Sequence, residues 1–501
     1  MNSKLSVYNS LSREKETFVP IEDGYVGLYV CGPTVYSNVH LGNIRTFTSF
    51  DMIFRYLKYL GYKVRYVRNI TDVGHLTGDS DDGKDKISER ARLERIEPME
   101  VVQKYTLHFH DMARIFNLAP PSIEPRATAH IIEQIKMVED IIANGFGYEK
   151  NGSVYFDTMA FMEKHDDYGK LSGRIVDDLL AESRDLKNQS EKKSPSDFAI
   201  WMKADETHLM KWPSPWSLGF PGWHLECSAM STKYLGKTFD IHGGGNDLKF
   251  PHHENEIAQS VGSCGCSPAK YWLHTNMLLL NGKKMSKSDG NTITAKQLFE
   301  GESEHVSKAY SPMAIRFFML QAHYGSTLDM SDTALKAAEK GYHRLMDANR
   351  TLQQIEHTYS GEYSNVNDLI ANGVKSVFDE MNDDFNTPKA MARLFELVPI
   401  INSYAADKPE FRKVSIENID ALKKCFSDVL FDIFGLKDEM VANENGSFSD
   451  KLAGVMDLVL DLRQAARANK DWGTSDKIRD ALSSLEIVVK DGKDGSSWTI
   501  K

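Results

Sequence analysis

The stretch YVGLYVCGPTVYSNVHLGNIRTF, residues 25–47, decides the fold class. Its first eight residues form an apolar, β-favouring run that ends in Gly-Pro, which predicts a strand followed by a turn. A helical spacing of apolar residues begins near Gly42 and stops at Gly61. The next segment, YKVRYVRNIT (62–71), predicts a second strand. A strand–helix–strand unit of this kind is the building element of a parallel α/β sheet.

A second α/β set lies at about residues 220–300. PGWHLECSAMSTKYLG predicts a helix, TFDIHGGG a strand leading into a glycine turn, and PHHENEIAQS another helix. YWLHTNMLLL predicts one further strand, after which the loop NGKKMSKSDGN follows. Between the two sets, residues 125–215 predict an insertion whose polar run ESRDLKNQSEKKSPSD (182–197) is an exposed loop.

The composition is that of an ordinary soluble protein with several domains. The 501 residues are 41% hydrophobic and 26% charged, and no apolar run approaches the ~20 residues that span a bilayer. The polar N-terminus lacks the apolar core of a signal peptide. Five cysteines, an odd count, argue against a disulfide framework and predict a cytoplasmic location. The net charge of -11 argues against indiscriminate coating of nucleic acid but allows a local basic groove.

Two short segments predict a nucleotide site, and the first is HLGN. His40, Gly42 and Asn43 fall where the strand gives way to the helix. A helix N-terminus offers unpaired N–H groups and a partial positive charge, both of which favour phosphate. Gly42 lets a ligand approach the backbone closely, and the other two side chains can donate to phosphate oxygens. On these residues alone, a His–Asn helix cap without a ligand remains the alternative.

The second segment is KKMSKSDGN, which places Lys283, Lys284 and Lys287 in a glycine-flanked loop after a strand. A mobile lysine loop can neutralise the charge that builds on a leaving pyrophosphate. The alternative is a solvated lysine turn, although the string KMSKS is far rarer than a generic basic turn.

HLGN at 40–43 followed by KMSKS at 284–288 resembles the paired signatures of class I aminoacyl-tRNA synthetases. The chain is similar to the cysteinyl-tRNA synthetase family over nearly its whole length. The motifs that carry the resemblance, in family order, are YVCGPTVY, RNITDVGH, GWHLECSAM, FDIHGGGNDLKFPHHENEIAQS, KMSKSDGN, DFNTP and KDWGTSDKIRDAL. In one departure, Asn43 stands where the first signature often ends in histidine, and an amide can still donate to phosphate.

The resemblance implies an α/β fold with a Rossmann-like, parallel-sheet catalytic domain split by an insertion. A C-terminal helical-bundle anticodon-type domain and a small terminal subdomain would follow. From about residue 310 the pattern is indeed helical, with an expected boundary at 439–450 and a hairpin at 485–501. The expected parts are a first catalytic half (1–125), a connective insertion (126–215), a second catalytic half (216–310), a helical stem-contact linker (311–350), a helical bundle (351–445) and an anticodon-binding subdomain (446–501).

Four side chains predict a metal site. His252 and Glu256 are four residues apart and therefore point from one helix face. Cys31 closes the first strand, at the edge where open α/β sheets bind ligands, and Cys227 lies on the helix that begins near Trp223. Two thiolates, an imidazole and a carboxylate suit zinc; buried structural cysteines and a helix-end histidine are the alternative. The resemblance implies that these positions hold one zinc ion per chain, which would select the thiol of cysteine over the hydroxyl of serine.

The remaining cysteines have simpler interpretations. Cys264 and Cys266, in SCGCSP, are competing thiols, but only the same helix could complete a tetrahedral set around them. An exposed loop is the plainer interpretation. Cys425 sits in a helical stretch and is predicted to be part of a core.

Thr71, Trp223 and Asp247 are the predicted substrate contacts. Trp223 shares a helix face with the second cysteine ligand and could wall the pocket. Thr71 follows a strand at the sheet edge and could contact the amino acid, while Asp247 could pair with its ammonium group. His224 and His242 could line the same pocket. A purely structural role is the alternative for these two histidines and for each of the three predicted contacts.

The resemblance also implies a two-step reaction. The cysteine carboxylate attacks the ATP α-phosphate, giving cysteinyl-adenylate and pyrophosphate, and a tRNA 3′ hydroxyl then takes the cysteinyl group. No general base is needed because the carboxylate is already ionised. Mg²⁺ would enter with ATP. The expected ATP contacts are His40, Gly42, Asn43 and Lys287, and the expected catalytic residues are His40, Asn43, Lys284 and Lys287.

Arg467 and Trp472 are the predicted tRNA contacts in the C-terminal region. An indole can stack on an unpaired base. The alternative is an amphipathic solvated helix with Trp472 in its core.

Two other functions stay open. A ligase that passes cysteine to an amino sugar shares the catalytic half, but such relatives lack a C-terminal anticodon-type region. A nonenzymatic zinc-dependent RNA-binding protein should have damaged signatures, whereas His40, KMSKS and all four metal positions are present. The expected partners are tRNA(Cys), ATP and L-cysteine, without a membrane, and the expected state is a monomer.

Overall fold

The chain forms two compact units, residues 1–436 and 437–501. The computed structural model describes residues 4–73, 86–165, 168–173, 191–206, 208–285, 291–357, 359, 361–439, 455–456, 458–484, 487–492 and 495–500. Two apolar cores lie in the first unit and one in the second. Among these described residues, no helix is both long and apolar enough to cross a membrane.

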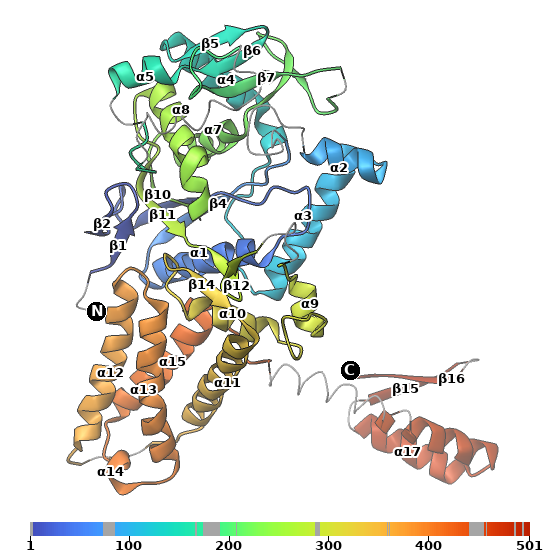
Figure 1. The fold of residues 1–501 in the computed structure, drawn as a ribbon. Helices are drawn as coiled ribbons and strands as arrows, with labels where there is room; N and C mark the ends of the chain where they lie inside the picture. Colours follow the sequence, from blue (N-terminus) through green and yellow to red (C-terminus); the bar gives the residue numbers. More distant parts are fainter. Residues whose placement is uncertain are drawn as a thin grey trace. The chain divides into compact units, whose positions relative to one another are not determined.

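A four-stranded parallel sheet forms the centre of the first unit (Figure 1). β3 (Tyr25–Val30) pairs with β4 (Lys63–Arg68) on one side and with β10 (Phe239–Gly245) on the other, and β10 pairs with β11 (Ala269–Thr275). The two α/β sets predicted from the sequence therefore share one sheet. Because all four strands are parallel, their carboxyl ends meet at a single edge, where such sheets bind ligands. The predicted fold class is confirmed.

Three helices begin near that edge, and the first two of them pack directly on the sheet. They are α1 (Leu41–Tyr59), α7 (Trp223–Leu235) and α8 (Glu254–Cys264). The predicted apolar stripe of α1 is buried, with Phe50 fully inaccessible. Gly243 of β10 permits this contact, since a Cβ there would lie 2.2 Å from the Phe50 ring. α8 begins at Glu254, and both histidines of PHHENEIAQS precede it in the wide turn η5 (Lys249–His253).

The segment YWLHTNMLLL forms two strands where one was predicted. The chain leaves the main sheet at Asn276, whose N–H donates to Tyr324 O at 2.9 Å. Arg45 of α1 then donates to Met277 O. β12 (Leu278–Leu280) consequently pairs with β13 (Lys283–Lys284) and β14 (Leu328–Met330) in a separate small sheet.

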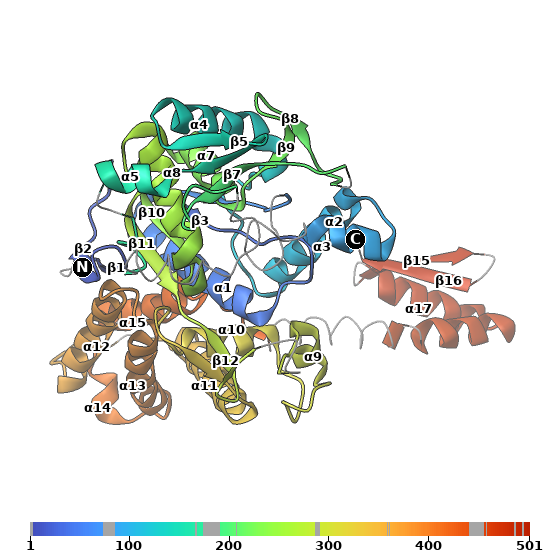
Figure 2. The ribbon, with the colours of Figure 1, turned by 45° about the horizontal axis from the view of Figure 1, so that its top comes forward.

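The insertion packs as a separate layer at the end of the first unit opposite its C-terminal helices (Figures 1 and 2). Its core joins α4 to a five-stranded sheet of order β5–β6–β7–β9–β8. Its elements are η2 (Ala127–His130), α4 (Ile131–Ala143), β5 (Gly147–Lys150), β6 (Ser153–Phe156), α5 (Thr158–Lys164), β7 (Phe198–Lys203), β8 (Trp212–Pro213) and β9 (Leu218–Pro221).

The prediction of an exposed loop at 182–197 is wrong for its last residues. Ser194 and Asp197 are buried. Asp197 accepts hydrogen bonds from Thr158 N–H at 3.0 Å and from the Tyr148 hydroxyl at 2.7 Å. These partners explain why a polar residue is buried there. Residues 182–190 lie outside the described residues.

After the small sheet, the first unit continues as helices, as predicted. α12 packs against α13 and α15, and α11 packs against α10 and α13. The remaining elements of this unit are β1 (Ser6–Asn9), β2 (Glu14–Thr17), α2 (Lys86–Glu94), α3 (Pro98–Ile115), η4 (Asn246–Leu248), α9 (Ala295–Glu300), α10 (Pro312–Leu320), α11 (Asp332–Gln353), α12 (Asn365–Asn382), α13 (Thr387–Ala405), α14 (Pro409–Arg412), α15 (Ile416–Ser427) and η6 (Asp428–Ile433).

The N-terminal strand β1 is tied to the turn between α12 and α13. Tyr8 N–H donates to Asp384 Oδ1 at 2.8 Å, and Asp384 N–H donates to Ser6 O at 3.0 Å. The Tyr324 hydroxyl donates to the same Oδ1 atom at 2.8 Å. Asp384 and Phe385 both have positive φ, at 61° and 55°. The surrounding contacts hold this turn in a backbone region that non-glycine residues seldom adopt.

The second unit contains α17 (Trp472–Ser484) and the predicted terminal hairpin, β15 (Ile487–Gly492) and β16 (Gly495–Ile500). Its small core includes Met456, Leu460, Leu482 and Ile487. The predicted boundary at 439–450 lies almost wholly outside the described residues. The boundary between the two compact units falls after Leu436.

Candidate active site

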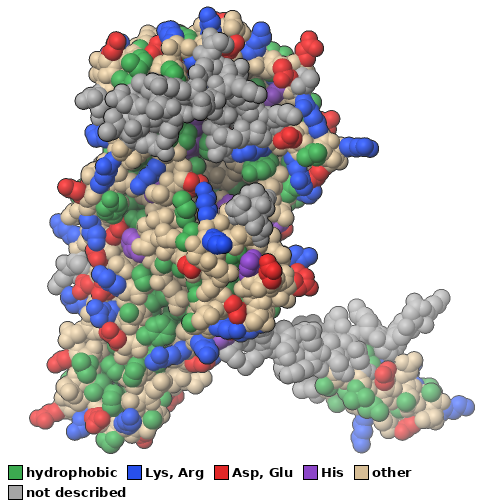
Figure 3. Space-filling view, viewed as in Figure 1, with side chains coloured by type: hydrophobic (Ala, Val, Ile, Leu, Met, Phe, Trp, Pro, Cys, Tyr) green, Lys and Arg blue, Asp and Glu red, His purple; other side chains and the backbone are tan. Residues whose placement is uncertain are grey.

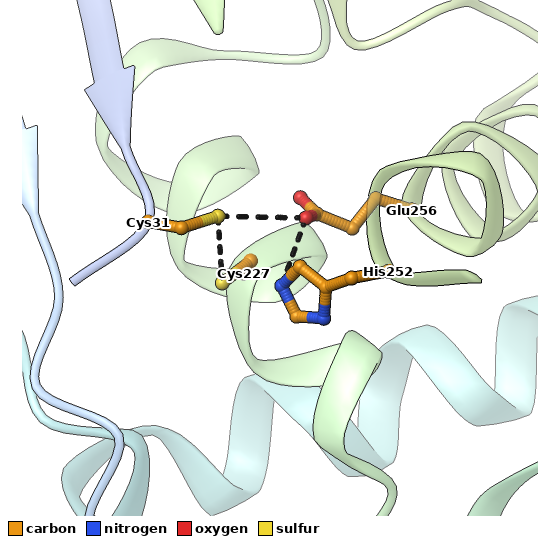
Figure 4. A group of neighbouring side chains, drawn as sticks. All are labelled: Cys31, Cys227, His252 and Glu256. Atoms are coloured by element: carbon orange, nitrogen blue, oxygen red, sulfur yellow. Dashed lines mark hydrogen bonds and ion pairs between the residues drawn. The ribbon is translucent and has the colours of Figure 1, made fainter. Parts of the chain in front are cut away.

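Cys31, Cys227, His252 and Glu256 converge at the carboxyl edge of the central sheet (Figure 4). Each comes from a different segment: the end of β3, helix α7, turn η5 and helix α8. One ligand atom from each lies within 4.8 Å of all the others, and all four residues are buried. The two sulfurs are 3.8 Å apart, Cys31 Sγ is 3.7 Å from Glu256 Oε1, and His252 Nε2 is 3.1 Å from that oxygen.

These spacings fit a tetrahedral zinc ion. With zinc about 2.3 Å from each sulfur, tetrahedral geometry keeps two thiolates about 3.8 Å apart. The distance between Cys31 Sγ and Cys227 Sγ is 3.8 Å. The donor set of two thiols, one imidazole and one carboxylate is also one that zinc prefers.

The electrostatics of the cluster also fit a cation. Burial raises the pKa of Cys31 well above its ordinary value, and Cys227 and Glu256 raise it further. Burial also raises the pKa of Cys227, with Glu256 adding to the effect. Each group that becomes an anion in this buried space therefore makes ionisation of the next group less favourable. A divalent cation would reverse that opposition by stabilising the thiolates.

Further histidines hold the cluster in place. His242 Nε2 lies 2.8 Å from Glu256 Oε2, and His224 Nδ1 lies 2.9 Å from His252 Nδ1. Partners of this kind fix the orientation of metal ligands and tune their basicity. From the sequence, each could line the pocket or be a histidine of the core, and support of a metal ligand is not predicted for either.

His253 is a neighbour that sequence reasoning missed. Its Nε2 lies 3.3 Å from Cys31 Sγ, and its Nδ1 lies 2.9 Å from His274 Nε2. A second group of converging donors consists of Cys31, His242, His253 and Glu256. The first group has two thiols rather than one and is the softer donor set, which favours it for zinc. The doubled histidine in PHHENE was the available signal.

The three predicted substrate contacts have different surroundings. The Trp223 ring lies over His252, with ring centroids 4.4 Å apart, so it forms a wall of the cluster. Thr71 is buried, and its Oγ1 accepts a hydrogen bond from Asn69 Nδ2 at 3.0 Å. Asp247 is exposed just beyond β10, where its Oδ1 would lie 2.3 Å from a Cβ built on Gly245.

His40 and Asn43 form a capping box at the N-terminus of α1. Asn43 N–H donates to His40 Nδ1 at 3.3 Å, and His40 N–H donates to Asn43 Oδ1 at 3.4 Å. The His–Asn cap considered from the sequence is therefore present. A Cβ on Gly42 would lie 3.0 Å from the His40 ring and 4.0 Å from Met285 Cε. The first residues of KMSKS thus lie beside HLGN.

The lysine loop is only partly described. Lys284 is exposed at the end of β13. Asn291 Nδ2 donates to Lys284 O at 3.2 Å and to Leu280 O at 3.4 Å, which closes the base of the loop. Lys287 lies outside the described residues.

The two predicted tRNA contacts lie in the second unit. Trp472 begins α17 and is 57% exposed, so the alternative that it forms core is wrong. Arg467 is exposed as well. In the first unit, Cys425 is buried, as predicted.

Comparisons with known protein families match three successive segments. Residues 17–340 match the family described as tRNA synthetases class I (C) catalytic domain. Residues 376–437 match the DALR domain, and residues 450–498 match the cysteinyl-tRNA ligase anticodon binding domain.

Curated relatives match over the full length. The chain is 52% identical over 501 residues to the cysteine–tRNA ligase of Phocaeicola vulgatus, covering 100% of both chains. It is 46% identical over 503 residues to that of Chlorobaculum tepidum, covering 100% of this chain and 99% of the relative. Among solved structures, Mycobacterium tuberculosis methionyl-tRNA synthetase in complex with methionyl-adenylate matches with a TM-score of 0.62 at 13% identity. That match covers 82% of this chain and 92% of the other, and it supports the fold alone.

Proposed function

The chain belongs to the cysteine–tRNA ligase family of class I aminoacyl-tRNA synthetases, and on that premise we propose how its residues work. L-cysteine is activated by ATP to cysteinyl-adenylate and is then transferred to the 3′ end of tRNA(Cys). A zinc ion held by Cys31, Cys227, His252 and Glu256 selects the substrate thiol. Mg²⁺ accompanies ATP.

The convergence of the four donors carries the proposal. They form a buried set with tetrahedral sulfur spacing at the ligand-binding edge of the sheet. Zinc would supply a soft Lewis acid that binds a thiolate and lowers its pKa, which a serine hydroxyl cannot match. A pocket that selected by shape alone would separate such near-isosteres only ~10–200-fold.

The residues around this cluster position the rest of the substrate. Trp223 covers His252 and walls the thiol pocket. Thr71 and Asp247, both at carboxyl ends of central strands, are the proposed contacts of the amino acid. Charge opposite to the cysteine ammonium, which Asp247 supplies, would orient the carboxylate toward ATP.

The HLGN and KMSKS segments would stabilise the phosphates. The N-terminus of α1, with His40, Gly42 and Asn43, directs backbone N–H groups and a partial positive charge at an anion. Lys284 and Lys287 would neutralise the charge that develops on the leaving pyrophosphate. To bind phosphate, His40 and Asn43 would either give up the hydrogen bonds that they make with each other in the cap or donate further ones.

The RNA partner would use specific contacts rather than a broad charged face. On the face shown in Figure 3, Lys and Arg side chains are interspersed with Asp and Glu over the described part of the first unit. Trp472 and Arg467 in the second unit are the proposed contacts for unpaired bases and phosphate. The match to an anticodon binding domain at 450–498 supports this and disfavours an amino-sugar acceptor.

The deciding experiment is charging of total tRNA with labelled cysteine and, in parallel, labelled serine. Wild type should charge cysteine alone.

Cys227→Ser should lose the metal and raise the cysteine KM at least tenfold, because a hydroxyl is a poor zinc ligand. Cys425→Ser, which removes a buried thiol far from the cluster in sequence, is the matched control and should keep both metal and KM. Unchanged cysteine affinity in a metal-free Cys227→Ser protein would contradict the role of zinc. Pyrophosphate exchange without any tRNA charging would point to the amino-sugar ligase.

A further inference from the structure

Cys264 and Cys266 form a second thiol pair that the proposed reaction does not use. Cys264 is the last residue of α8, and Gly265 ends the helix in the left-handed region with φ 76°. The two Sγ atoms are 2.7 Å apart. Both side chains are partly exposed, whereas Cys31, Cys227 and Cys425 are buried.

The spacing of this pair distinguishes it from the metal thiols. Two thiolates on one tetrahedral zinc ion lie about 3.8 Å apart, which is the separation of Cys31 and Cys227. At 2.7 Å, the sulfurs of Cys264 and Cys266 are too close to share such an ion. They are instead nearer to the ~2.05 Å of a covalent S–S bond.

The pair also lies at the other end of the sheet from the metal cluster. Phe239 N–H, at the start of β10, donates to Pro268 O at 2.9 Å, and Thr238 Oγ1 donates to Ser267 O at 2.9 Å. The turn that contains the pair is thus fixed at the amino end of the strands. The metal cluster occupies the carboxyl end, and the eight positions along α8 from Glu256 to Cys264 separate the two by roughly 12 Å.

We propose that Cys264 and Cys266 are a redox-active dithiol that closes to an intrachain disulfide by exchange with a low-molecular-weight disulfide. Cys266, which lies beyond the end of α8, attacks one sulfur of the small disulfide as a thiolate and releases one small thiol. Cys264, as its thiolate, then attacks the Cys266 sulfur of the mixed disulfide and releases the second. Two protein thiols are oxidised and one small disulfide is reduced to two thiols, so the electrons balance.

The order of attack follows from the surroundings. Burial, together with the hydrogen bond to Cys266, raises the pKa of Cys264, which makes it the slower first nucleophile. Gly265 lies between the two cysteines with φ 76°, a backbone conformation that glycine adopts without strain. A Cβ there would meet no atom within 4 Å, so this backbone angle is what favours glycine at the position. In a reducing compartment the pair would remain open and would close only when the thiol pool becomes oxidised.

Mass spectrometry of the full-length protein after exposure to oxidised glutathione and alkylation of the remaining thiols tests the proposal. Wild type should gain a Cys264–Cys266 disulfide, with neither residue alkylated, and should return to the dithiol on reduction. Cys264→Ser should trap a glutathione adduct on Cys266, because no second thiol resolves it. Cys425→Ser is the control and should behave as wild type.

The metal content should stay unchanged through this cycle, because the pair lies at the opposite end of α8. Two results would overturn the proposal. One is alkylation of both Cys264 and Cys266 in wild type after the same exposure. The other is a stable glutathione adduct on Cys266 in wild type that Cys264 does not resolve.

Discussion

Burial raises the pKa of the Cys31 and Cys227 thiols, whereas a bound metal ion would lower it. The pKa values of both thiols are raised, with burial as the largest cause. They are therefore protonated near neutral pH until a cation displaces the protons. The pKa of Cys425 is raised to about 12 by burial, and among the residues that the structure describes, neither group of converging metal donors includes it.

Metal affinity should accordingly rise with pH. Binding releases about two protons from the two thiols, so the apparent Kd for zinc should fall by up to about a hundredfold for each pH unit between about pH 6 and pH 8. Metal titration of the apoprotein in a competing chelator measures this. Cys425→Ser should show the same slope, since that thiol keeps its proton throughout. A Kd that does not change with pH would mean that the thiols are not the ligands.

The residues of the site differ in how far the sequence could predict them. Cys31 and Cys227 could be brought together because strand ends and helix starts meet at one edge of a parallel sheet. His253 could not be placed, because its direction depends on α8 beginning at Glu254 rather than at the preceding proline. For His40 and Asn43, the spacing predicted both a cap and a phosphate site, and one pair of side chains can serve both uses.

At the scale of elements, a buried ion pair joins α1 to α10. Arg316 is fully buried and pairs with Asp51, which also accepts from Arg55 Nε at 2.8 Å. Arg316 Nε donates to Phe434 O at 2.7 Å, just before the end of the first unit. The helix that begins with HLGN is thereby fixed to the last residues of this unit.

Asp51→Ala should destabilise the first unit by roughly 3–5 kcal/mol, because it leaves a buried guanidinium unpaired. Thermal or denaturant unfolding followed by circular dichroism would measure this. Asp347→Ala is the matched control: Asp347 also pairs with an arginine, Arg350, but its side chain is 64% exposed. Its loss should cost less than about 1 kcal/mol. Equal effects of the two substitutions would show that the buried ion pair contributes no more to the free energy of unfolding than the exposed one.

Element boundaries were the part of the fold that local sequence could not give. YWLHTNMLLL has the pattern of one strand, yet it divides at Asn276 because Tyr324 and Arg45 take its backbone hydrogen bonds. Both partners lie far from the segment in sequence. Periodicity within a short window contains no information about such partners.

At the scale of the whole molecule, the two units have separate cores. A chain that ends at Leu436 should fold and keep cysteine-dependent pyrophosphate exchange within about threefold. Its charging of tRNA should fall more than about tenfold, since even one lost base stack is worth ~1–3 kcal/mol. Trp472→Ala in the full-length chain should produce a smaller loss of charging. Full charging by the truncated chain would exclude a role for the second unit in binding tRNA.

The tie between β1 and Asp384 has a consequence for the order in which the chain folds during its synthesis. Tyr8 and Asp384 are separated by 376 positions. The N-terminal strand therefore leaves the ribosome long before its partner in the helical region is made. Chains fold from the N-terminus as they emerge, so β1 must wait with its edge open until the turn after α12 appears. The first unit thus closes only near the end of its own translation, and a chain that stops before Asp384 would expose that edge to other chains.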